Sequence, residues 1–319
     1  MDHPLRLAIG AGDVRDAARR LGHRVRRTPV LRLDRLGLLA KCESLQGIGA
    51  FKIRGATNAV LGMRPAGVVT SSSGNHGMAV AAAAAAARIP AVVVMPDNAT
   101  EYKREAVARL GAEVLTSPPE TDARNAAAAA VAAERGLTLV PAYDHPLVIA
   151  GQGTCGLEIA EQVPEAATVV VPLGGGGLLS GVAVALRDAI GARVRIVGVE
   201  PADGDDTLRS LRAGRRVAIP APRTICDGAR NTVPGELTFP IVEALVDDIV
   251  AVDDAAVVEA VRALAAGGLV VEPTGALAVA GAMCLPAAGR RGAIVCVVSG
   301  RNIAPAEHAR LVIGGGEPG

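Results

Sequence analysis

A lysine between apolar neighbours is the first candidate for chemistry in this sequence. Lys52 lies between Phe51 and Ile53, within the segment GAFKIRGA at residues 49–56. A lysine held in apolar surroundings has a lowered pKa and can act as a nucleophile or a base. The chain has only three lysines among its 33 basic residues, and arginine cannot replace an amine that must lose its proton. The alternative is an ordinary lysine at the start of a helix.

Two glycine-containing segments could bind an anion. Residues 71–77 read SSSGNHG, and the run Gly174, Gly175, Gly176 and Gly177 follows an apolar stretch. Each segment lies between an expected strand and an expected helix, where backbone N–H groups and the helix dipole favour anions. The first segment could equally be a serine N-cap with glycine turns. A run of four glycines is entropically costly for a plain turn, so anion binding is the better interpretation of the second.

Further polar residues follow expected strands. Ser299 comes directly after an apolar run, at the sheet edge where ligands bind in open parallel sheets. Glu200, Gly204 and Asp206 supply two carboxylates and a carbonyl, which suit a hard cation such as Mg²⁺ or Ca²⁺. A solvated acidic loop is an equal alternative for these three. No Gly-Lys-Ser/Thr follows the glycine run, and the acidic ribose partner of a dinucleotide-binding dehydrogenase is missing from the expected context.

These residues must be positioned by alternating strands and helices. Apolar β-type runs alternate with alanine-rich helical segments, which predicts a parallel sheet covered on both faces. The expected strands are residues 67–70, 91–95, 113–116, 137–140, 168–172, 195–200, 248–252 and 293–299. The expected helices include residues 78–87, 123–134 and 178–190.

Composition excludes several classes of protein. The 319 residues carry a net charge of +1, which gives no reason to expect a nucleic acid or an acidic membrane surface as partner. The beginning of the chain lacks the apolar core of a signal peptide, and no uncharged apolar run reaches the roughly 18 residues of a membrane span. Five dispersed cysteines are typical of reduced thiols in a cytoplasmic protein.

The motifs together are specific. FKIRGA, SSGNHG, GGGG and SG-x-N, in this order, resemble the serine/threonine dehydratase and serine racemase family, whose members depend on pyridoxal 5′-phosphate. The resemblance runs from Arg27 to about Asn302, and includes residues 41–43, 150–154, 227–228 and 271–275. It implies an α/β, two-lobed three-layer sandwich of the tryptophan synthase β-like kind (fold type II). The large cofactor-binding domain would be residues 1–67 and 146–319, and the small mobile domain residues 68–145.

The resemblance also implies roles for the site residues. Lys52 would hold the cofactor aldehyde covalently, with Phe51 against the ring, Asn75 at the ring hydroxyl and Ser299 at the pyridine nitrogen. The phosphate would be bound by Gly174, Gly175, Gly176, Gly177 and the N–H of Leu178. Ser72, Asn75 and His76 would receive the substrate carboxylate. Ser73 would lie across the cofactor from Lys52, where a serine is the second acid/base in the racemase branch. Glu200, Gly204 and Asp206 match a divalent-cation site found in part of the family.

The implied activity is β-elimination. A small β-hydroxy amino acid, such as L-threonine or L-serine, would lose water and yield a 2-keto acid and ammonia. The alternatives are an amino acid racemase, a dehydratase for a specialised substrate such as 3-hydroxyaspartate or phenylserine, and a non-catalytic cofactor-binding protein. Arg301 stands where the family often has glycine, so it could crowd the ring or bind a second acidic group of the substrate. A homodimer is expected by analogy alone.

Overall fold

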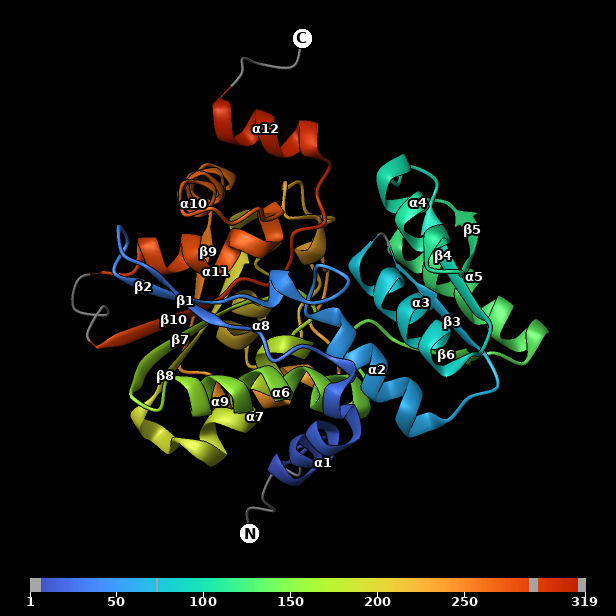
Figure 1. Ribbon diagram of the computed structural model, residues 1–319, viewed down its shortest axis with the longest axis horizontal. Coiled ribbons are helices and arrows are strands. Elements are labelled where there is room, and N and C mark those ends of the chain that lie inside the picture. Colours follow the sequence, from blue (N-terminus) through green and yellow to red (C-terminus); the bar gives the residue numbers. More distant parts are fainter. Residues whose placement is uncertain (1–6, 73, 287–291, 315–319) are drawn as a thin grey trace.

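The computed structural model describes residues 7–72, 74–286 and 292–314, which contain two separate β-sheets (Figure 1). The larger sheet has the strand order β1-β2-β10-β7-β8-β9, and the smaller has the order β5-β4-β3-β6. The strands of the larger sheet are β1 (Val30–Leu33), β2 (Leu38–Lys41), β7 (Ala166–Pro172), β8 (Arg195–Pro201), β9 (Asp248–Val252) and β10 (Ala293–Val297). Those of the smaller are β3 (Val68–Ser71), β4 (Ala91–Pro96), β5 (Glu113–Ser117) and β6 (Thr138–Leu139).

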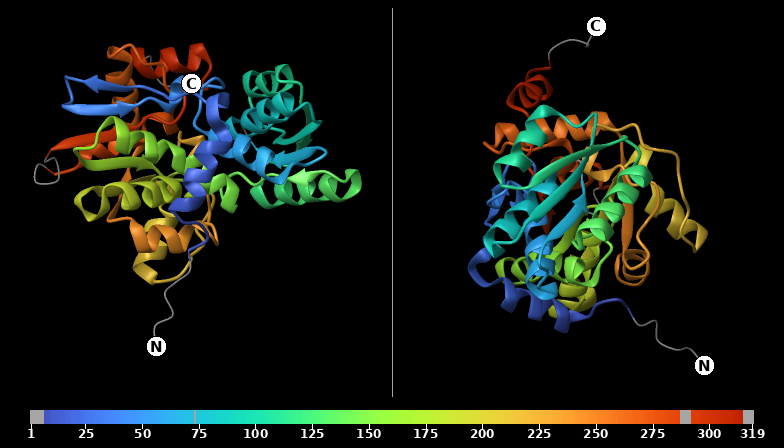
Figure 2. Two further views of the ribbon diagram at one scale, coloured as in Figure 1. Left: turned by 60° about the horizontal axis from the view of Figure 1, so that its bottom comes forward. Right: turned by 90° about the vertical axis from the view of Figure 1, so that its right-hand side faces the viewer.

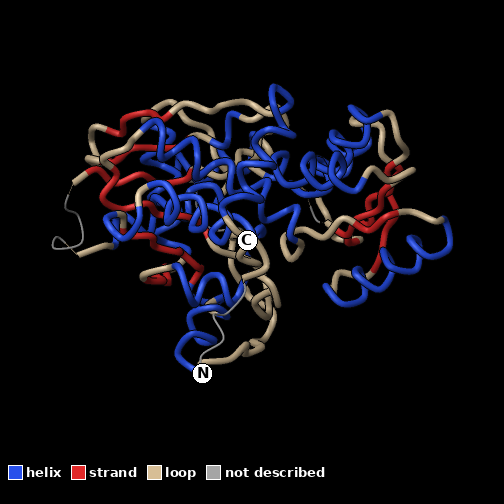
Figure 3. The backbone as a smooth tube through the Cα atoms, turned by 90° about the horizontal axis from the view of Figure 1, so that it is seen from below, coloured by secondary structure: helices blue, strands red, loops and turns tan. Residues whose placement is uncertain are grey.

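Helices cover both faces of each sheet. They are α1 (Ala11–Leu21), α2 (Lys52–Met63), α3 (Asn75–Ala87), α4 (Glu101–Arg109), α5 (Thr121–Arg135), α6 (Pro146–Gln162), α7 (Gly177–Ala189), α8 (Asp206–Ala213), α9 (Thr238–Leu245), α10 (Asp254–Ala266), α11 (Pro273–Cys284) and α12 (Pro305–Ile313). Figure 3 shows the two sets of strands on either side of a helical middle. The fold is therefore the predicted α/β arrangement of two layered lobes.

The larger sheet is buried on both sides, as its apolar strands predict. Along β7, Val169 and Val171 pack in one apolar cluster with α6 and α7. Val170 points the other way, into a cluster with α10 and α11. This alternation follows from the two-residue period of a strand. The result is a helix–sheet–helix sandwich around the central strands β10, β7 and β8.

The smaller sheet is a second sandwich, which faces the viewer in the right-hand view of Figure 2. Val68 and Val93 pack with α3, whereas Val69 and Val92 pack with α5. The alanines of these helices allow close approach to the strands, because they have small side chains and high helix propensity. All strands of this sheet pair in parallel.

The sequence missed one feature of the larger sheet. All eight predicted strands are present, but β1 and β2 form an additional hairpin, and β1 is antiparallel to β2. Both strands have only four residues, and β1 exposes Leu31 and Arg32 at the sheet edge. The edge strand β1 lacks the continuous apolar pattern that identified the buried strands, and β2 is a short segment that ends in a lysine.

Two predictions from composition can be compared with the structure. Among residues 7–72, 74–286 and 292–314, no helix is long and apolar enough to cross a membrane. The five cysteines are free thiols, and all but Cys284 are buried.

Candidate functional site

Lys52 is the first residue of α2 and is half-buried. Its Nζ donates a hydrogen bond to the carbonyl of Ala142 at 2.7 Å and lies 5.2 Å from the centroid of the Phe51 ring. No carboxylate pairs with this amine in the described part of the chain. Burial lowers the pKa of Lys52 to about 8. A sizeable fraction of the amine is therefore neutral at slightly alkaline pH, as a nucleophile or base requires.

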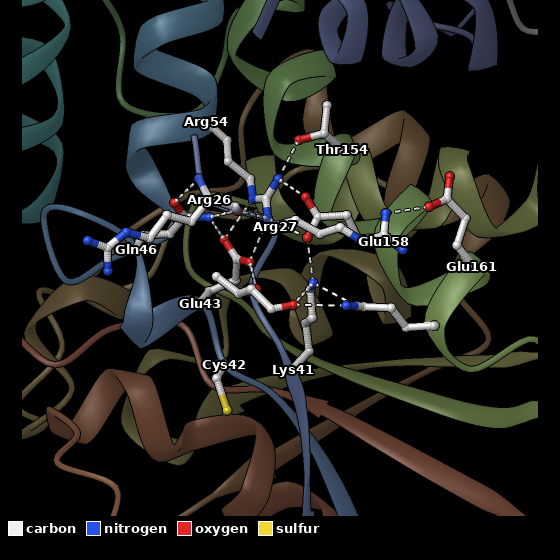
Figure 4. A network of polar contacts seen from close by, with 12 residues as sticks. Arg26, Arg27, Lys41, Cys42, Glu43, Gln46, Arg54, Thr154, Glu158 and Glu161 are labelled. Carbon is white, nitrogen blue, oxygen red and sulfur yellow. Dashed lines mark hydrogen bonds and ion pairs between the residues drawn. The ribbon is translucent and has the colours of Figure 1, made fainter. Parts of the chain in front are cut away.

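A buried cluster of ion pairs anchors the same helix (Figure 4). Arg54 is fully buried and donates to both oxygens of Glu43, at 2.7 and 2.8 Å, and to both oxygens of Glu158, at 2.7 and 2.8 Å. Lys41, also fully buried, pairs with Glu158. Burial alone would raise the pKa of Glu43, but the charge of Arg54 outweighs it and lowers that pKa. These charged partners hold the first turn of α2, and thus the backbone of Lys52, in one position.

The four-glycine run lies where it was predicted, between β7 and α7, with Gly176 as the N-cap. A Cβ on Gly175 would lie 2.3 Å from the ring of Tyr143, and one on Gly174 would lie 2.9 Å from oxygen atoms of a neighbouring loop. Gly176 has a φ of 86°, which other residues rarely adopt. The first N–H groups of α7, including that of Leu178, have no partner inside the helix. The run is therefore a candidate anion cradle.

Tyr143 connects the lysine to this cradle. Ala142 accepts the hydrogen bond of Lys52, and the next residue, Tyr143, packs its ring against Gly175. Sequence analysis did not select Tyr143. A usable signal was present, because the chain has only two tyrosines, two phenylalanines and no tryptophan, and Phe51 is a second member of this small set at the site.

The segment before α3 combines a helix cap with a neutral histidine. Ser72 Oγ accepts hydrogen bonds from the N–H groups of Gly74, at 3.1 Å, and Gly77, at 2.8 Å. The ring of His76 bonds the carbonyl of Val140 through Nε2 at 3.0 Å, so Nε2 carries the proton. His76 Nδ1 is buried without a partner. Burial, reinforced by the charge of Lys52, lowers the pKa of His76 to about 3.

The histidine geometry limits how a substrate carboxylate could bind here. The neutral ring presents only the lone pair of Nδ1 on this side, and an ionised carboxylate has no proton to donate to it. The backbone N–H groups of Asn75 and His76, in the first turn of α3, remain suitable donors. Ser73, predicted as a second acid/base, lies outside the described residues.

Asn75 and Ser299 come together from different lobes. Asn75 Nδ2 donates to Glu272 Oε1 at 2.6 Å, and Asn75 Oδ1 accepts from Asn302 Nδ2 at 2.6 Å. Ser299 is buried and its carbonyl accepts the N–H of Phe51 at 3.0 Å. Contacts therefore connect the predicted lysine, glycine run, Asn75 and Ser299 into one site. Sequence analysis quoted Glu272 and Asn302 within matching motifs but assigned neither a role.

A second contact between the lobes involves another of the three lysines. Lys103 on α4 forms an ion pair with Asp227, which lies in a loop of the large lobe. Thr274, at the start of α11, contacts the same loop: its Oγ1 accepts from the N–H of Gly228 at 3.0 Å and donates to Asp227 Oδ1 at 3.5 Å. Sequence analysis did not assign Lys103 a role.

The acidic residues at the end of β8 form a separate site. Glu200 and Asp206 are buried, and Glu200 accepts the N–H groups of Thr207 and Leu208 at 3.1 and 3.0 Å. Asp206 Oδ2 is buried without a partner. Burial raises the pKa of Glu200 to about 7, and burial with the charge of Glu200 raises that of Asp206 to about 8.

The Glu200 and Asp206 carboxylates could bind a cation, although two side chains are few ligands for one. No basic side chain of the described residues pairs with Glu200 or Asp206. The same ranges contain no group of three or more His, Cys, Asp or Glu side chains suited to a metal. A cation would therefore use two carboxylates and backbone oxygen such as that of Gly204, which is buried beside them.

Arg301 lies beside Gly49. Its side chain is exposed, and a Cβ on Gly49 would lie 3.2 Å from Arg301 Cγ. Its N–H donates to the carbonyl of Gly49 at 2.9 Å. No ion pair of Arg301 occurs among the described residues.

The chain is similar to known proteins over almost its whole length. A family model described as "Pyridoxal-phosphate dependent enzyme" matches residues 22–300. L-threo-3-hydroxyaspartate ammonia-lyase of Saccharomyces cerevisiae is 42% identical over 314 residues, which cover 95% of this chain and 96% of that protein. L-threonine ammonia-lyase of Geobacter sulfurreducens is 40% identical over 301 residues, 91% of this chain and 75% of that protein. The solved structure of maize serine racemase matches with a TM-score of 0.90 and 38% identity, covering 96% of this chain and 98% of that one.

Proposed function

We propose, given that this chain belongs to the pyridoxal-phosphate dependent enzymes, that it is an ammonia-lyase acting on a small β-hydroxy amino acid such as L-threonine or L-serine. One observation carries the proposal. Lys52 has a pKa lowered to about 8 by burial, and within the described ranges its hydrogen-bond partner is a backbone carbonyl alone. An amine in this state can form an imine and later accept a proton.

The residues present fit the cofactor. Lys52 would hold the aldehyde, and the run Gly174–177 with the N–H of Leu178 would hold the phosphate, because side chains are sterically excluded there. Asn75 would contact the ring oxygen and Ser299 the ring nitrogen. Phe51 and Tyr143 would supply apolar surface beside the ring.

The bound cofactor supplies an electron-withdrawing ring for the electron pair released when the α-proton leaves. The protein supplies binding and proton transfer. Backbone N–H groups of Asn75 and His76, together with the Ser72 hydroxyl, would bind the substrate carboxylate. Lys52 Nζ, once free and neutral, would take the α-proton. Lys52 would return that proton to the β-hydroxyl, which would leave as water, and a second water would hydrolyse the remaining fragment to a 2-keto acid and ammonia.

Ser299 favours elimination over transamination. Its hydroxyl is neutral, whereas a carboxylate in the same position would stabilise a proton on the ring nitrogen. A ring nitrogen without that proton is a weaker electron sink, which suits a reaction in which charge departs with the leaving group.

A keto acid assay tests the proposal. The holoenzyme is expected to release a 2-keto acid and ammonia in equal amounts from at least one member of a panel of β-hydroxy amino acids. Lys52→Ala is expected to abolish turnover and covalent cofactor attachment, and Lys52→Arg, the matched variant that keeps the charge, is expected to do the same. Full turnover by Lys52→Ala, or no keto acid from any β-hydroxy amino acid, would reject the proposal.

We infer that Glu200, Gly204 and Asp206 hold Mg²⁺ or Ca²⁺. Two buried carboxylates repel each other without a cation, and Asp206 Oδ2 lacks a partner. Adding either ion to chelator-treated protein is expected to raise the unfolding temperature by several degrees, since binding to the folded state stabilises it. Asp206→Asn should remove this response, whereas Asp203→Asn, on the exposed side of the same loop, should retain it. An equal response in Asp206→Asn would contradict the assignment.

A second candidate substrate is 3-hydroxyaspartate. The yeast relative is named for this substrate, and the exposed guanidinium of Arg301 has no acidic partner in the described ranges. In this case Arg301→Met is expected to raise the KM for 3-hydroxyaspartate and leave that for threonine unchanged. Equal effects on both substrates would remove Arg301 from substrate selection.

Racemisation is the remaining alternative, since relatives include serine racemase. Chiral analysis of serine after incubation distinguishes it from elimination. Appearance of D-serine faster than keto acid would make racemisation the main activity.

A further inference from the structure

The hydrogen bonds around Asn75 define which way its amide points. Asn75 Oδ1 accepts from Asn302 Nδ2, and Asn75 Nδ2 donates to Glu272 Oε1, each at 2.6 Å. An amide has an oxygen that only accepts and a nitrogen that only donates. One contact therefore occupies the oxygen of the Asn75 amide and the other occupies one N–H of its nitrogen. The second N–H of that nitrogen remains available for another acceptor.

The backbone carbonyl of Ile48 determines the orientation of the Asn302 and Asn75 amides. Asn302 Nδ2 also donates to the carbonyl oxygen of Ile48 at 3.0 Å. A carbonyl oxygen cannot donate, so Asn302 must turn its nitrogen toward Ile48 and Asn75. Asn75 must then turn its oxygen toward Asn302 and its nitrogen toward Glu272. Burial raises the pKa of Glu272 to about 8, but a carboxyl group accepts a hydrogen bond in either protonation state, so the orientation does not depend on its charge.

Two glycines make room for this chain of hydrogen bonds. A Cβ on Gly300 would lie 1.9 Å from Glu272 Oε1, and one on Gly49 would lie 2.6 Å from Asn302 Oδ1. The Glu272 side chain is 4% exposed, so it cannot move aside into solvent without breaking the contact. Glu272 and Asn302 belong to the large lobe, while Asn75 begins α3 of the smaller one.

We propose that Glu272 and Asn302 are positioning residues that fix the Asn75 amide with its nitrogen available to the cofactor, so that it donates a hydrogen bond to the ring oxygen. This inference rests on the proposed function, in which Asn75 contacts that oxygen. A donated N–H stabilises the anionic form of the oxygen, whereas a flipped amide would repel it. The two residues thus control the electronic state of the cofactor without touching substrate.

Asn302→Asp provides the main test. Aspartate is nearly the same size but has no N–H for Ile48 or Asn75, so Asn75 is expected to turn its nitrogen toward position 302. The ratio of the visible to the near-ultraviolet absorbance of the bound cofactor, which reports the anionic ring oxygen, is expected to fall. The dissociation constant for pyridoxal phosphate should rise about tenfold, as for the loss of one hydrogen bond to a charged atom. Glu272→Gln is the matched control, since its side-chain oxygen can still accept from Asn75, and it should retain the wild-type spectrum.

The outcomes separate this inference from the proposed function. A wild-type protein that takes up no cofactor would reject the proposed function. A wild-type protein that binds cofactor, beside an Asn302→Asp variant with the same absorbance ratio and affinity, would overturn the positioning role alone. If Asn302→Asp does not fold, Asn302→Ala replaces it, because it removes the N–H groups that Ile48 and Asn75 accept and leaves the Glu272 contact intact. An unchanged absorbance ratio in Asn302→Ala would equally overturn the inference.

Discussion

The lowered pKa of Lys52 comes from burial and not from a neighbouring charge. Burial is also the main reason that the pKa of His76 is lowered, and the positive charge of Lys52 adds to it, so His76 is neutral. Desolvation always disfavours the charged form, so it lowers the pKa of both bases. This part of the site is therefore prepared for an uncharged amine before any ligand binds.

Selective labelling of the apoprotein tests this state of Lys52. Since the charged form is disfavoured, the reactive neutral amine becomes the main form above about pH 8. An amine-directed reagent should modify Lys52 with a midpoint near that pH, as measured by peptide mapping of the three lysines. Lys103 is the internal control, because its ion pair with Asp227 outweighs burial and raises its pKa. The same pH dependence for Lys52 and Lys103 would contradict the interpretation.

At the scale of elements, α2 is the part that holds the site in place. Its first residue carries the candidate chemistry, and Arg54 joins it to Glu43 and Glu158 from two other segments. Removal of one partner from a buried ion pair leaves an uncompensated charge, which lowers the stability of the folded protein. The helix position therefore depends on a complete set of ion pairs.

Arg54→Met is expected to lower the free energy of unfolding by ~3–5 kcal/mol, because it leaves the buried carboxylate of Glu43 without its cationic partner. Chemical denaturation measures this loss. The control is Arg135→Met, whose ion pair with Glu113 is largely exposed and should contribute far less to stability. Similar losses in both variants would show that the buried cluster does not anchor α2.

Sequence patterns predicted every described strand except those of the short hairpin β1–β2. Strands β7 and β10 are continuous apolar runs with both faces covered, which is the pattern expected of buried strands in a parallel sheet. The hairpin β1–β2 depends on pairing with β10, which is distant in the sequence. The candidate cofactor-binding residues were predicted from motifs, but the orientation of the Asn75 amide was not, because it depends on Glu272 and Asn302 from two distant segments.

At the scale of the whole molecule, polar contacts hold the two lobes together. Lys103 pairs with Asp227, and Asn75 contacts Glu272 and Asn302, so the start of α3 and helix α4 both reach the large lobe. The scarcity of lysine was informative here. Lys41 lies in the buried cluster, Lys52 at the site and Lys103 between the lobes, whereas arginine supplies the other basic residues.

A double-mutant cycle tests the contact between the lobes. Lys103→Met and Asp227→Asn should each raise the KM, because they weaken closure over the substrate, and the double variant should be no worse than either one. A coupling of about 1 kcal/mol is expected for a partly buried pair. Arg109→Met on the same helix is the control, since Arg109 pairs with Glu105 within the small lobe. Additive effects would mean that this ion pair does not act in closure.

The strand order has a consequence for synthesis on the ribosome. The four strands β3–β6 are contiguous in the chain, so the small sheet is complete early. In the larger sheet β10 lies between β2 and β7, so the early hairpin β1–β2 stays without its neighbour until Ala293–Val297 has been translated. Ser299 and Asn302 emerge later still. A nascent chain that stalls before β10 therefore carries Lys52 but lacks the strand and the loop that bring Ser299 and Asn302 to it.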